Sequence, residues 1–243
     1  MNVIPVISIQ DKTIASFIFG QEINLSTFQL VTAFDQFINK NCKRYIIETV
    51  PSYHMVTVFF NRTISSDLLT KEILAMWEKY PVGNALNTTK QITIPVCYEE
   101  PFALDLDRVS KEINLSKEQI IEKHCEPLYT VFFIGFLPGF PYLGGLQKDL
   151  YIPRLEIPRK NVQKGSVGIG GQQTGIYPVD SPGGWNIIGK TPIDLFNVKR
   201  KHPFLLQAGN QLKFEKISKE QFDELEQQLS KDSEYVFELL KMN

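Results

Sequence analysis

The feature of the sequence that most limits the possible folds is the distribution of its glycines. Twelve of the 15 glycines fall between residues 135 and 191, at positions 135, 139, 144, 145, 165, 168, 170, 171, 175, 183, 184 and 189. Glycine is used where the backbone needs a positive φ angle or where another group must approach it closely. This stretch is therefore expected to form either the tight turns of a compact β structure or a surface shaped for a ligand.

The glycine-rich stretch also differs from the whole chain in charge. Six basic residues and three acidic residues lie within it, so its net charge is +3 in a chain whose net charge is −1. The charged residues are Lys148, Arg154, Arg159, Lys160, Lys164 and Lys190 against Asp149, Glu156 and Asp180. A mildly basic, glycine-rich surface suits a small anion such as a carboxylate or a phosphate.

The composition is that of an ordinary globular protein. The 243 residues, 43% hydrophobic and 22% charged, are typical of a globular protein with one large or two small domains. No basic run exceeds Lys199–Lys201, so nothing indicates a nucleic-acid partner. The N-terminus lacks the features of a signal peptide, no apolar run could span a bilayer, and the three cysteines show no CxxC spacing. These observations predict a reduced, cytoplasmic protein.

The first third of the chain alternates strand and helix patterns. Strands are expected over residues 13–19, 45–50 and 54–60, and helices follow the apolar spacing of residues 26–38 and 69–80. This order predicts a small α+β domain of ferredoxin-like type over residues 1–86, with residues 91–98 as a possible closing strand. The polar run from Asn84 to Lys90 is expected to mark the domain boundary.

The rest of the chain is dominated by short strand patterns separated by glycine and proline turns. This pattern predicts a closed β-barrel over residues 91–217. Capping-box sequences that begin at Ser116 and Ser218 predict two helices. The second of them starts a C-terminal helical extension over residues 218–243.

One segment matches a nucleotide-binding pattern letter for letter. Residues 184–191, GWNIIGKT, fit the G-x-x-x-x-G-K-[ST] pattern of a P-loop. A P-loop needs small residues that bend around the phosphates and a long helix after them. Here bulky residues fill the middle, and Pro192 follows directly. The match is therefore interpreted as a coincidence, and the segment as a barrel strand that ends at Lys190.

Two groups of polar residues could hold an anionic substrate. Gln172, Gln173, Thr174 and Gly175 offer amide and hydroxyl groups beside glycines, although they could instead bond their own turn. Five glycines within residues 165–175 exceed the need of one turn and favour the binding role. Arg154 and Arg159, each preceded by proline, could clamp a carboxylate or a phosphate through paired N–H groups, or could form surface ion pairs. The full set assigned to substrate or anion binding is Arg154, Arg159, Gln172, Gln173, Thr174, Gly175, Ser181, Gly183 and Gly184.

His124 is the candidate for proton transfer. An imidazole gains and loses a proton near neutral pH, but a histidine at a helix end could equally make one structural hydrogen bond. A Cys–His pair with Cys125 is disfavoured, because neighbouring helical residues point about 100° apart. The three histidines are far apart in sequence, so no metal site is predicted.

The uncharged segment Leu137–Leu143 lies on a stiff frame of proline and glycine. Such a segment is either part of the core or an interface with a partner protein. Trp185 has the same two interpretations. The residues assigned to a partner interface are Phe136, Leu137, Pro138, Phe140, Tyr142 and Trp185.

Taken together, these motifs resemble the allophanate hydrolase subunit 1 family. The resemblance spans roughly residues 1–217, and long, specific segments carry it: Gly135–Leu143, Pro153–Arg154 with Pro158–Arg159, Gly165–Ile169 with Gln173–Pro178, and Ser181–Trp185 with Ile188–Pro192. The family includes the B subunit of bacterial 5-oxoprolinase and the kinase inhibitor KipI. Related modules form the carboxyltransferase part of urea carboxylase.

The resemblance implies both a fold and a function. It implies a cyclophilin-like barrel after a small α+β domain. It also implies a subunit, inactive alone, that works with subunits A and C to open 5-oxo-L-proline to L-glutamate with hydrolysis of ATP, so ATP with Mg²⁺ is the expected cofactor of the complex. Two alternatives stay open. The chain could be an inhibitor that docks on a sensor histidine kinase, or a subunit of carboxyltransferase or allophanate and urea metabolism.

Overall fold

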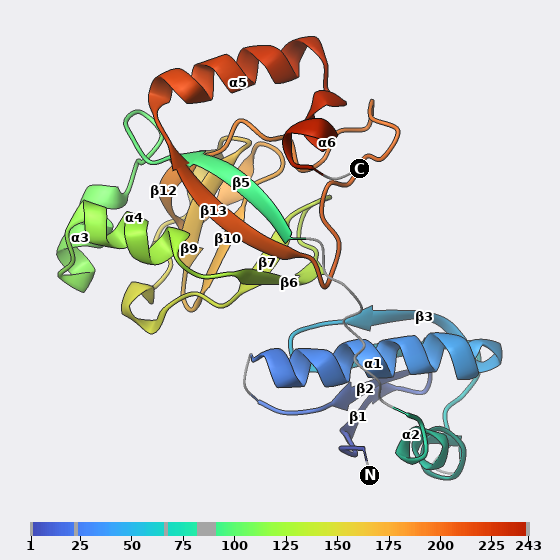
Figure 1. Cartoon of the computed structure of the whole chain (residues 1–243). Coiled ribbons are helices and arrows are strands. Elements are labelled where there is room, and N and C mark those ends of the chain that lie inside the picture. The colour runs from blue at the N-terminus through green and yellow to red at the C-terminus, as the bar shows by residue number, and fades with distance from the viewer. Residues whose placement is uncertain (1, 22–23, 66–67, 82–90, 242–243) are drawn as a thin grey trace. The chain divides into compact units, whose positions relative to one another are not determined.

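The computed structural model describes residues 2–21, 24–65, 68–81 and 91–241. The chain divides into two compact units, Met1–Thr88 and Thr89–Asn243 (Figure 1). The boundary expected between Asn84 and Lys90 lies outside the described residues. Within the described ranges, no helix has the length and apolar character needed to cross a membrane.

The first unit is a four-stranded antiparallel sheet with helices. Its strands stand in the order β1-β2-β4-β3. Their bounds are β1 Val6–Asp11, β2 Ile14–Ile18, β3 Ile46–Pro51 and β4 Met55–Phe60. Three helical segments accompany them: α1 Leu25–Asn41, a π-helical segment Leu68–Leu74, and α2 Ala75–Glu78, with a short 3-10 turn at Lys43–Tyr45. Phe17, Phe34 and Trp77 meet in its core, where the Phe34 and Trp77 ring centroids lie 5.0 Å apart.

The edge of this sheet differs from the expected order. The strand over residues 91–98, which was a possible closing strand, belongs instead to the second unit, and the fourth strand of the sheet is β1 at the N-terminus. The ferredoxin-like description therefore stays a prediction. Strand β1 contributes few apolar side chains to the core, because Val6 and Ile9 are both exposed.

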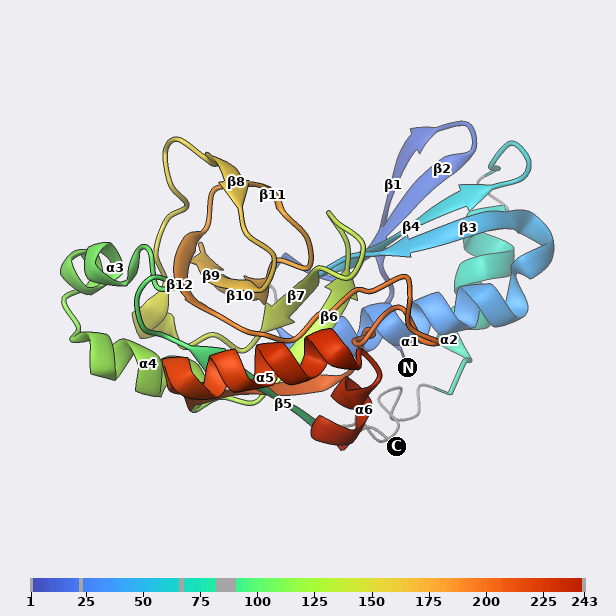
Figure 2. The same cartoon turned by 90° about the horizontal axis from the view of Figure 1, so that it is seen from above.

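The second unit contains a closed barrel, which confirms that expectation. Seven strands close it in the order β10-β7-β6-β13-β5-β12-β9. Their bounds are β5 Gln91–Cys97, β6 Tyr129–Ile134, β7 Pro141–Gly144, β9 Ser166–Gly170, β10 Gln173–Ile176, β12 Asn186–Lys190 and β13 Gln211–Ile217. Strands β5 and β13 pair in parallel over seven residues. A separate ribbon, β8 Arg159–Val162 with β11 Ser181–Gly183, stands apart from this ring (Figure 2).

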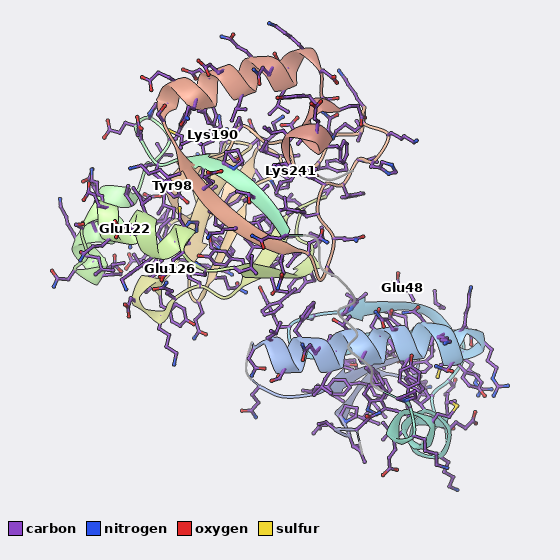
Figure 3. The ribbon with its side chains drawn as sticks, in the orientation of Figure 1. Glu48, Tyr98, Glu122, Glu126, Lys190 and Lys241 are labelled. Carbon is purple, nitrogen blue, oxygen red and sulfur yellow. The ribbon has the colours of Figure 1, made fainter. Side chains whose placement is uncertain are left out.

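Helices flank the barrel. Their bounds are α3 Leu106–Ile113, α4 Lys117–Cys125, α5 Lys219–Lys231 and α6 Tyr235–Leu239, with a 3-10 turn at Lys148–Leu150. Both expected capping boxes are present, at the first residues of α4 and α5. Helix α5 packs on β5 through Phe222, which confirms a C-terminal helix. Glu122 and Glu126 lie on the exposed side of α4, and Tyr98 lies in the interior (Figure 3).

Close packing explains several glycines of the glycine-rich stretch. A Cβ at Gly189 of β12 would lie 2.8 Å from the carbonyl oxygen of Cys97 on β5, and a Cβ at Gly170 would enter the ring of Trp185. The P-loop-like segment is therefore a barrel strand, as its bulky residues indicated. Its backbone pairs with β5 and β9, so its amides do not form a phosphate cradle.

Candidate functional site

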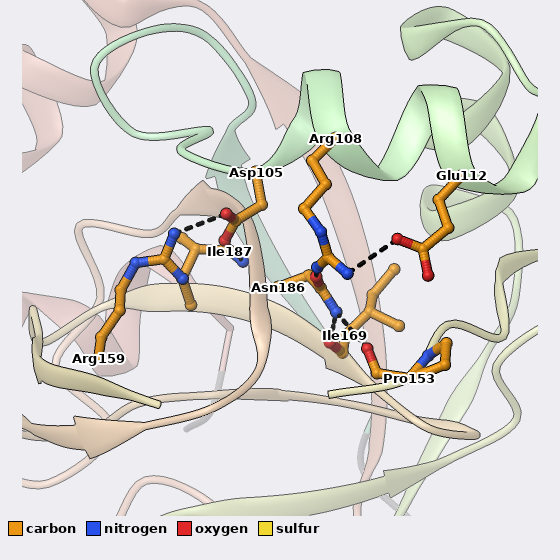
Figure 4. A network of polar contacts seen from close by, with 8 residues as sticks. All are labelled: Asp105, Arg108, Glu112, Pro153, Arg159, Ile169, Asn186 and Ile187. Atoms are coloured by element: carbon orange, nitrogen blue, oxygen red, sulfur yellow. Dashed lines mark hydrogen bonds and ion pairs between the residues drawn. The ribbon is translucent and has the colours of Figure 1, made fainter. Parts of the chain in front are cut away.

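A polar network joins α3 to the barrel and to the β8–β11 ribbon (Figure 4). At its centre is Asp105, which is 5% exposed and directly precedes α3. One carboxylate oxygen accepts a hydrogen bond from Nη2 of Arg159 at 2.6 Å, and the other accepts one from the backbone N–H of Ile187 at 2.6 Å. The backbone N–H of Asp105 donates in return to the carbonyl oxygen of Ile187 at 2.8 Å. Asp105 therefore fixes both the helix and Arg159 to strand β12.

A second branch of the network centres on Asn186, which is fully buried. Its Nδ2 donates to the carbonyl oxygens of Pro153 at 2.9 Å and Ile169 at 3.1 Å. Its Oδ1 accepts from the guanidinium of Arg108, which also forms an ion pair with Glu112 at 2.8 Å. The amide thus ties the start of the arginine-bearing segment, at Pro153, to the barrel wall.

Five of the residues assigned to anion binding lie together at this place. The ribbon pairs Ser181 with Val162 and Gly183 with Arg159. The backbone N–H of Leu155, next to Arg154, donates to the carbonyl oxygen of Gly184 at 2.7 Å. The guanidinium carbon of Arg154 lies 5.8 Å from the ring centroid of Trp185. The five residues that gather are Arg154, Arg159, Ser181, Gly183 and Gly184.

The other four residues of that set lie elsewhere on strands β9 and β10 or their turn. Gln172 is exposed, and Gln173 is buried. A Cβ on Gly175 would lie 2.8 Å from the carbonyl oxygen of Pro141 and 3.1 Å from the Trp185 ring, so its backbone is covered by packing. Thr174 is fully buried and points to His124. These four residues do not form one surface with the arginines, and their role in anion binding stays a prediction.

His124 lies in a buried network inside the barrel. The Thr174 hydroxyl donates to the carbonyl oxygen of Gly168 at 3.0 Å, so it accepts from Nε2–H of His124 at 2.8 Å. Nδ1 in turn accepts from the Tyr98 hydroxyl at 2.8 Å. The imidazole stacks on Phe214, with ring centroids 4.4 Å apart. Both ring nitrogens are occupied within the protein, so this geometry is that of a structural histidine, and proton transfer to a substrate stays a prediction.

Burial makes His124 a source of pH-dependent stability. It lowers the pKa of the imidazole from 6.5 to about 3. The unfolded chain binds a proton near pH 6.5 that the folded chain does not bind, so the stabilisation is fully present above pH 6.5 and is lost as the pH falls toward 3. Between pH 6.5 and pH 5, one such proton changes the free energy of unfolding by about 2 kcal/mol.

We expect urea unfolding curves to show a lower free energy of unfolding at pH 5.0 than at pH 7.5. In a His124→Phe variant, this decrease between the two pH values should be smaller by about 2 kcal/mol. The exposed His202 provides a matched control, because His202→Gln replaces a histidine outside the buried network and leaves His124 in place. Equal pH dependence in the parent and in His124→Phe would contradict the assignment.

The apolar segment divides into a buried part and an exposed part. Phe140 and Trp185 are 2% and 5% exposed and belong to an aromatic cluster with Tyr177, Val162 and Ile187. Leu137 and Tyr142 are half-buried against that cluster. Phe136 and Pro138 are exposed, and Phe136 holds a positive φ of 65°. A partner could therefore contact Phe136 and Pro138 directly, whereas Phe140 and Trp185 shape the surface from below.

Asp105, Arg108 and Asn186 were not singled out from the sequence. Their partners lie far along the chain: Asp105 meets Arg159 54 residues later, and Arg108 meets Asn186 78 residues later. Asn186 lies inside the P-loop-like segment, where the pattern drew attention to Lys190. The one local signal was that Asp105 precedes a helix, a position usually used to cap it. Its side chain makes no capping hydrogen bond here, because both oxygens are used elsewhere.

The described residues include no group of three or more His, Cys, Asp or Glu side chains placed to hold a metal ion. The charged groups at the candidate site are instead Arg154, Arg159 and Asp105, with the Arg108–Glu112 ion pair in the second branch of the network. Guanidinium groups and hydroxyls bind carboxylates and phosphates through hydrogen bonds. The arrangement is therefore suited to hold and orient an anion.

Comparison with known proteins assigns the chain to a family. Residues 6–206 match the family described as carboxyltransferase domain, subdomain C and D. The B subunit of 5-oxoprolinase from Bacillus subtilis is 37% identical over 219 residues, which cover 84% of this chain and 89% of that protein. The B subunit of 5-oxoprolinase from Haemophilus influenzae is 44% identical over 169 residues, covering 70% and 78% of the two chains.

A solved structure has a similar fold. The crystal structure of TTHA0988 matches with a TM-score of 0.71 and 29% identity over 84% of this chain. This chain spans 40% of the length of TTHA0988. The family match begins at the first residue of β1 and ends before β13, so it includes both the first unit and most of the barrel. The chain therefore belongs to the carboxyltransferase domain C and D family, together with the B subunits of 5-oxoprolinases.

Proposed function

We propose that this chain is the B subunit of a 5-oxoprolinase, which opens 5-oxo-L-proline to L-glutamate with hydrolysis of ATP. The observation that carries the proposal is the similarity, along most of both chains, to proteins named as the B subunit of that enzyme. The name of those relatives supports assembly with further subunits, and we propose subunits A and C as the partners. Cytoplasmic location is part of the same proposal.

The site supports the role of a subunit that binds rather than one that acts alone. Asp105 holds Arg159 in place, and Arg154 lies beside it over Trp185. These residues can hold and orient the carboxylate of 5-oxoproline. ATP with Mg²⁺, bound to the complex, would supply the activation of the ring carbonyl as a phosphorylated species. The candidate site in this chain then keeps the substrate in one orientation.

A docking function is the second candidate, and a specific observation favours it. Phe136 is 64% exposed although it is a large apolar side chain, and its backbone holds a positive φ that non-glycine residues rarely adopt. Exposed aromatic side chains on strained loops are typical of contact surfaces. The same loop could contact a sensor histidine kinase or another protein of the complex. The family description leaves a role as a carboxyltransferase subunit as a further alternative, and the similarity to a urea amidolyase and a putative urea carboxylase leaves one in allophanate and urea metabolism.

Reconstitution tests the proposed function. We expect release of ADP that depends on 5-oxoproline when this protein is mixed with its subunits A and C, and no release when any one of the three is omitted. Phe136→Ser should leave the barrel folded and, if the loop contacts one of the other subunits, raise the concentration of this protein needed for half-maximal activity.

The matched control for these assays is Lys160→Gln, because Lys160 is exposed on β8 beside Arg159. This substitution should leave the rate of 5-oxoproline-dependent ADP release unchanged. A complete mixture without 5-oxoproline-dependent ADP release would reject the proposal. If the protein alone then suppressed autophosphorylation of a histidine kinase, and Phe136→Ser abolished this effect, the docking function would replace it.

A further inference from the structure

Two buried polar atoms at the candidate site have no hydrogen-bond partner. Among the described residues, the buried side-chain atoms without a partner are Nη1 of Arg159, Oγ of Ser181, Nδ1 of His54 and Nε of Arg200. Two of these four lie on the same small ribbon. A buried polar group without a partner costs about 1–3 kcal/mol, and such groups in folded proteins often await a ligand or a water molecule.

The ribbon places these two residues on neighbouring strands. Gly183 is paired with Arg159 and Ser181 with Val162, and an irregularity in the register lies between the two pairs. Val162 belongs to the cluster of Tyr177 and Trp185, and the Tyr177 ring lies against Gly183, the partner of Arg159. Both pairs of the ribbon therefore border that cluster.

Further polar groups border the same space. The Tyr177 hydroxyl lies so close to Gly183 that a Cβ there would overlap it. Burial, the largest effect, raises the pKa of Tyr177, and the charges of Arg154 and Arg159 act in the opposite direction. The guanidinium carbon of Arg154 also lies 5.8 Å from the ring centroid of Trp185, a member of the same cluster. Gly183, which has no side chain to occupy the space, thus lies against Tyr177, is paired with Arg159 and is two residues from Ser181.

The net charge of this group selects among anions. Arg154 and Arg159 contribute two positive charges, and the carboxylate of Asp105, bonded to Nη2 of Arg159, offsets one of them. The remaining charge of +1 balances one carboxylate. A phosphate dianion or a nucleotide triphosphate would stay under-neutralised at this place. The planar guanidinium also offers its free Nη1 edge to a carboxylate oxygen.

We propose that Arg159 and Ser181 form a subsite for a single carboxylate, with Arg154 and Tyr177 at its border. The proposal rests on the proposed function, since it identifies the ligand group as the carboxylate of 5-oxoproline. Nη1 of Arg159 and Oγ of Ser181 donate to this carboxylate, and Asp105 positions the guanidinium. The lactam ring of the ligand then faces away from the arginine, where its carbonyl is available to the rest of the complex.

Displacement of residues 155–158 would open the subsite. In this conformation Nη1 and Oγ are covered, although the Arg159 side chain as a whole is 28% exposed. Residues 156–158 are exposed, with Ile157 at 85%, and one backbone hydrogen bond, from Leu155 N–H to the carbonyl oxygen of Gly184, holds the segment. Displacement would break that bond and leave Arg154 at the border of the subsite.

The fluorescence of Trp185 provides a direct binding assay. The chain has two tryptophans, Trp77 in the first unit and Trp185 beside Arg154, so a full-length Trp77→Phe protein reports on the subsite alone. We expect 5-oxo-L-proline to change this signal and to bind at least about tenfold more tightly than 2-pyrrolidinone, which has the same ring without the carboxylate. Inorganic phosphate should bind no more tightly than 5-oxoproline.

Two variants test the donors. Arg159→Lys keeps the charge but loses the planar pair of N–H groups, and Ser181→Ala removes one hydroxyl. Each is expected to weaken 5-oxoproline binding about tenfold and to raise its KM in the assembled enzyme by a similar factor, with little change in kcat. Ser181→Ala removes an unpartnered buried hydroxyl, so it should not lower the stability of the barrel. Lys160→Gln is the control and should bind like the parent.

The outcomes separate this proposal from the proposed function. Equal binding of 5-oxoproline and 2-pyrrolidinone, tighter binding of phosphate, or unchanged KM values in both variants would overturn the subsite even if the three-subunit mixture is active. Carboxylate-dependent binding that both variants weaken would uphold the subsite even if that mixture shows no turnover. Absence of both 5-oxoproline binding and turnover would overturn both.

Discussion

Replacing His124 with alanine is expected to lower the free energy of unfolding of the barrel by about 3–5 kcal/mol, the range found when a large buried ring is truncated. The change removes a fully buried ring that stacks on Phe214 and leaves the Tyr98 hydroxyl without its acceptor. The Thr174 hydroxyl keeps its bond to Gly168. Urea unfolding followed through Trp185 in the Trp77→Phe protein measures the barrel separately from the first unit.

His124→Phe separates packing from hydrogen bonding. It keeps a ring against Phe214 but cannot bond Tyr98 or Thr174, so we expect a loss of about 1–3 kcal/mol, smaller than that of the alanine variant. If both variants were as stable as the parent, the network would have no structural role. A fully active, fully stable alanine variant would also remove His124 from the candidates for proton transfer.

Replacing Asp105 with alanine is expected to destabilise the barrel by about 3 kcal/mol, the lower end of the range for breaking a buried ion pair. The lower end applies because the Arg159 side chain is 28% exposed, so water can solvate part of the charge left behind. The variant also leaves the Ile187 N–H without its acceptor. Because Arg159 loses its anchor, 5-oxoproline binding should weaken in the same variant.

Asp105→Asn refines this test. The amide oxygen can still accept from the Ile187 N–H while the charge opposite Arg159 is lost, so we expect a smaller loss of stability than for alanine. Asp107→Asn, an exposed acidic residue on the same helix that pairs with Lys117, serves as the control and should leave the unfolding midpoint unchanged. Equal midpoints for the parent and Asp105→Ala would show that the network is dispensable for folding.

The parts of the fold that were predictable from the sequence are those with a strong local pattern. The barrel follows from many short apolar strands with glycine turns, and the capping boxes fix the first residues of α4 and α5. Strand β1 was not predicted, because it is an edge strand whose apolar residues Val6 and Ile9 face solvent. The placement of residues 91–97 beside β13 depends on pairing across more than 100 residues, which no local pattern records.

The candidate site was predictable only in its residue types. The arginines and the Ser181–Gly184 segment were identified, and the structure gathers them because β8 pairs with β11. Asp105 was missed because an acidic residue before a helix is usually a cap. His124 and Thr174 were predicted to act on a substrate. In the structure both are buried, and their polar groups form hydrogen bonds within the protein instead. The sequence alone does not distinguish a ligand-binding site from a buried structural network, since both use hydrogen-bonding side chains beside glycine.

The parallel pairing of β5 with β13 has a consequence for how the protein is made. These two strands are the first and the last of the ring along the chain, residues 91–97 and 211–217, and they are neighbours in it. During synthesis the ring therefore stays open until residue 217 has left the ribosome, whereas the first unit, within residues 1–88, is complete much earlier. For more than 100 residues of elongation, β5 is therefore without its parallel partner, and its unpaired edge needs protection from aggregation during that time.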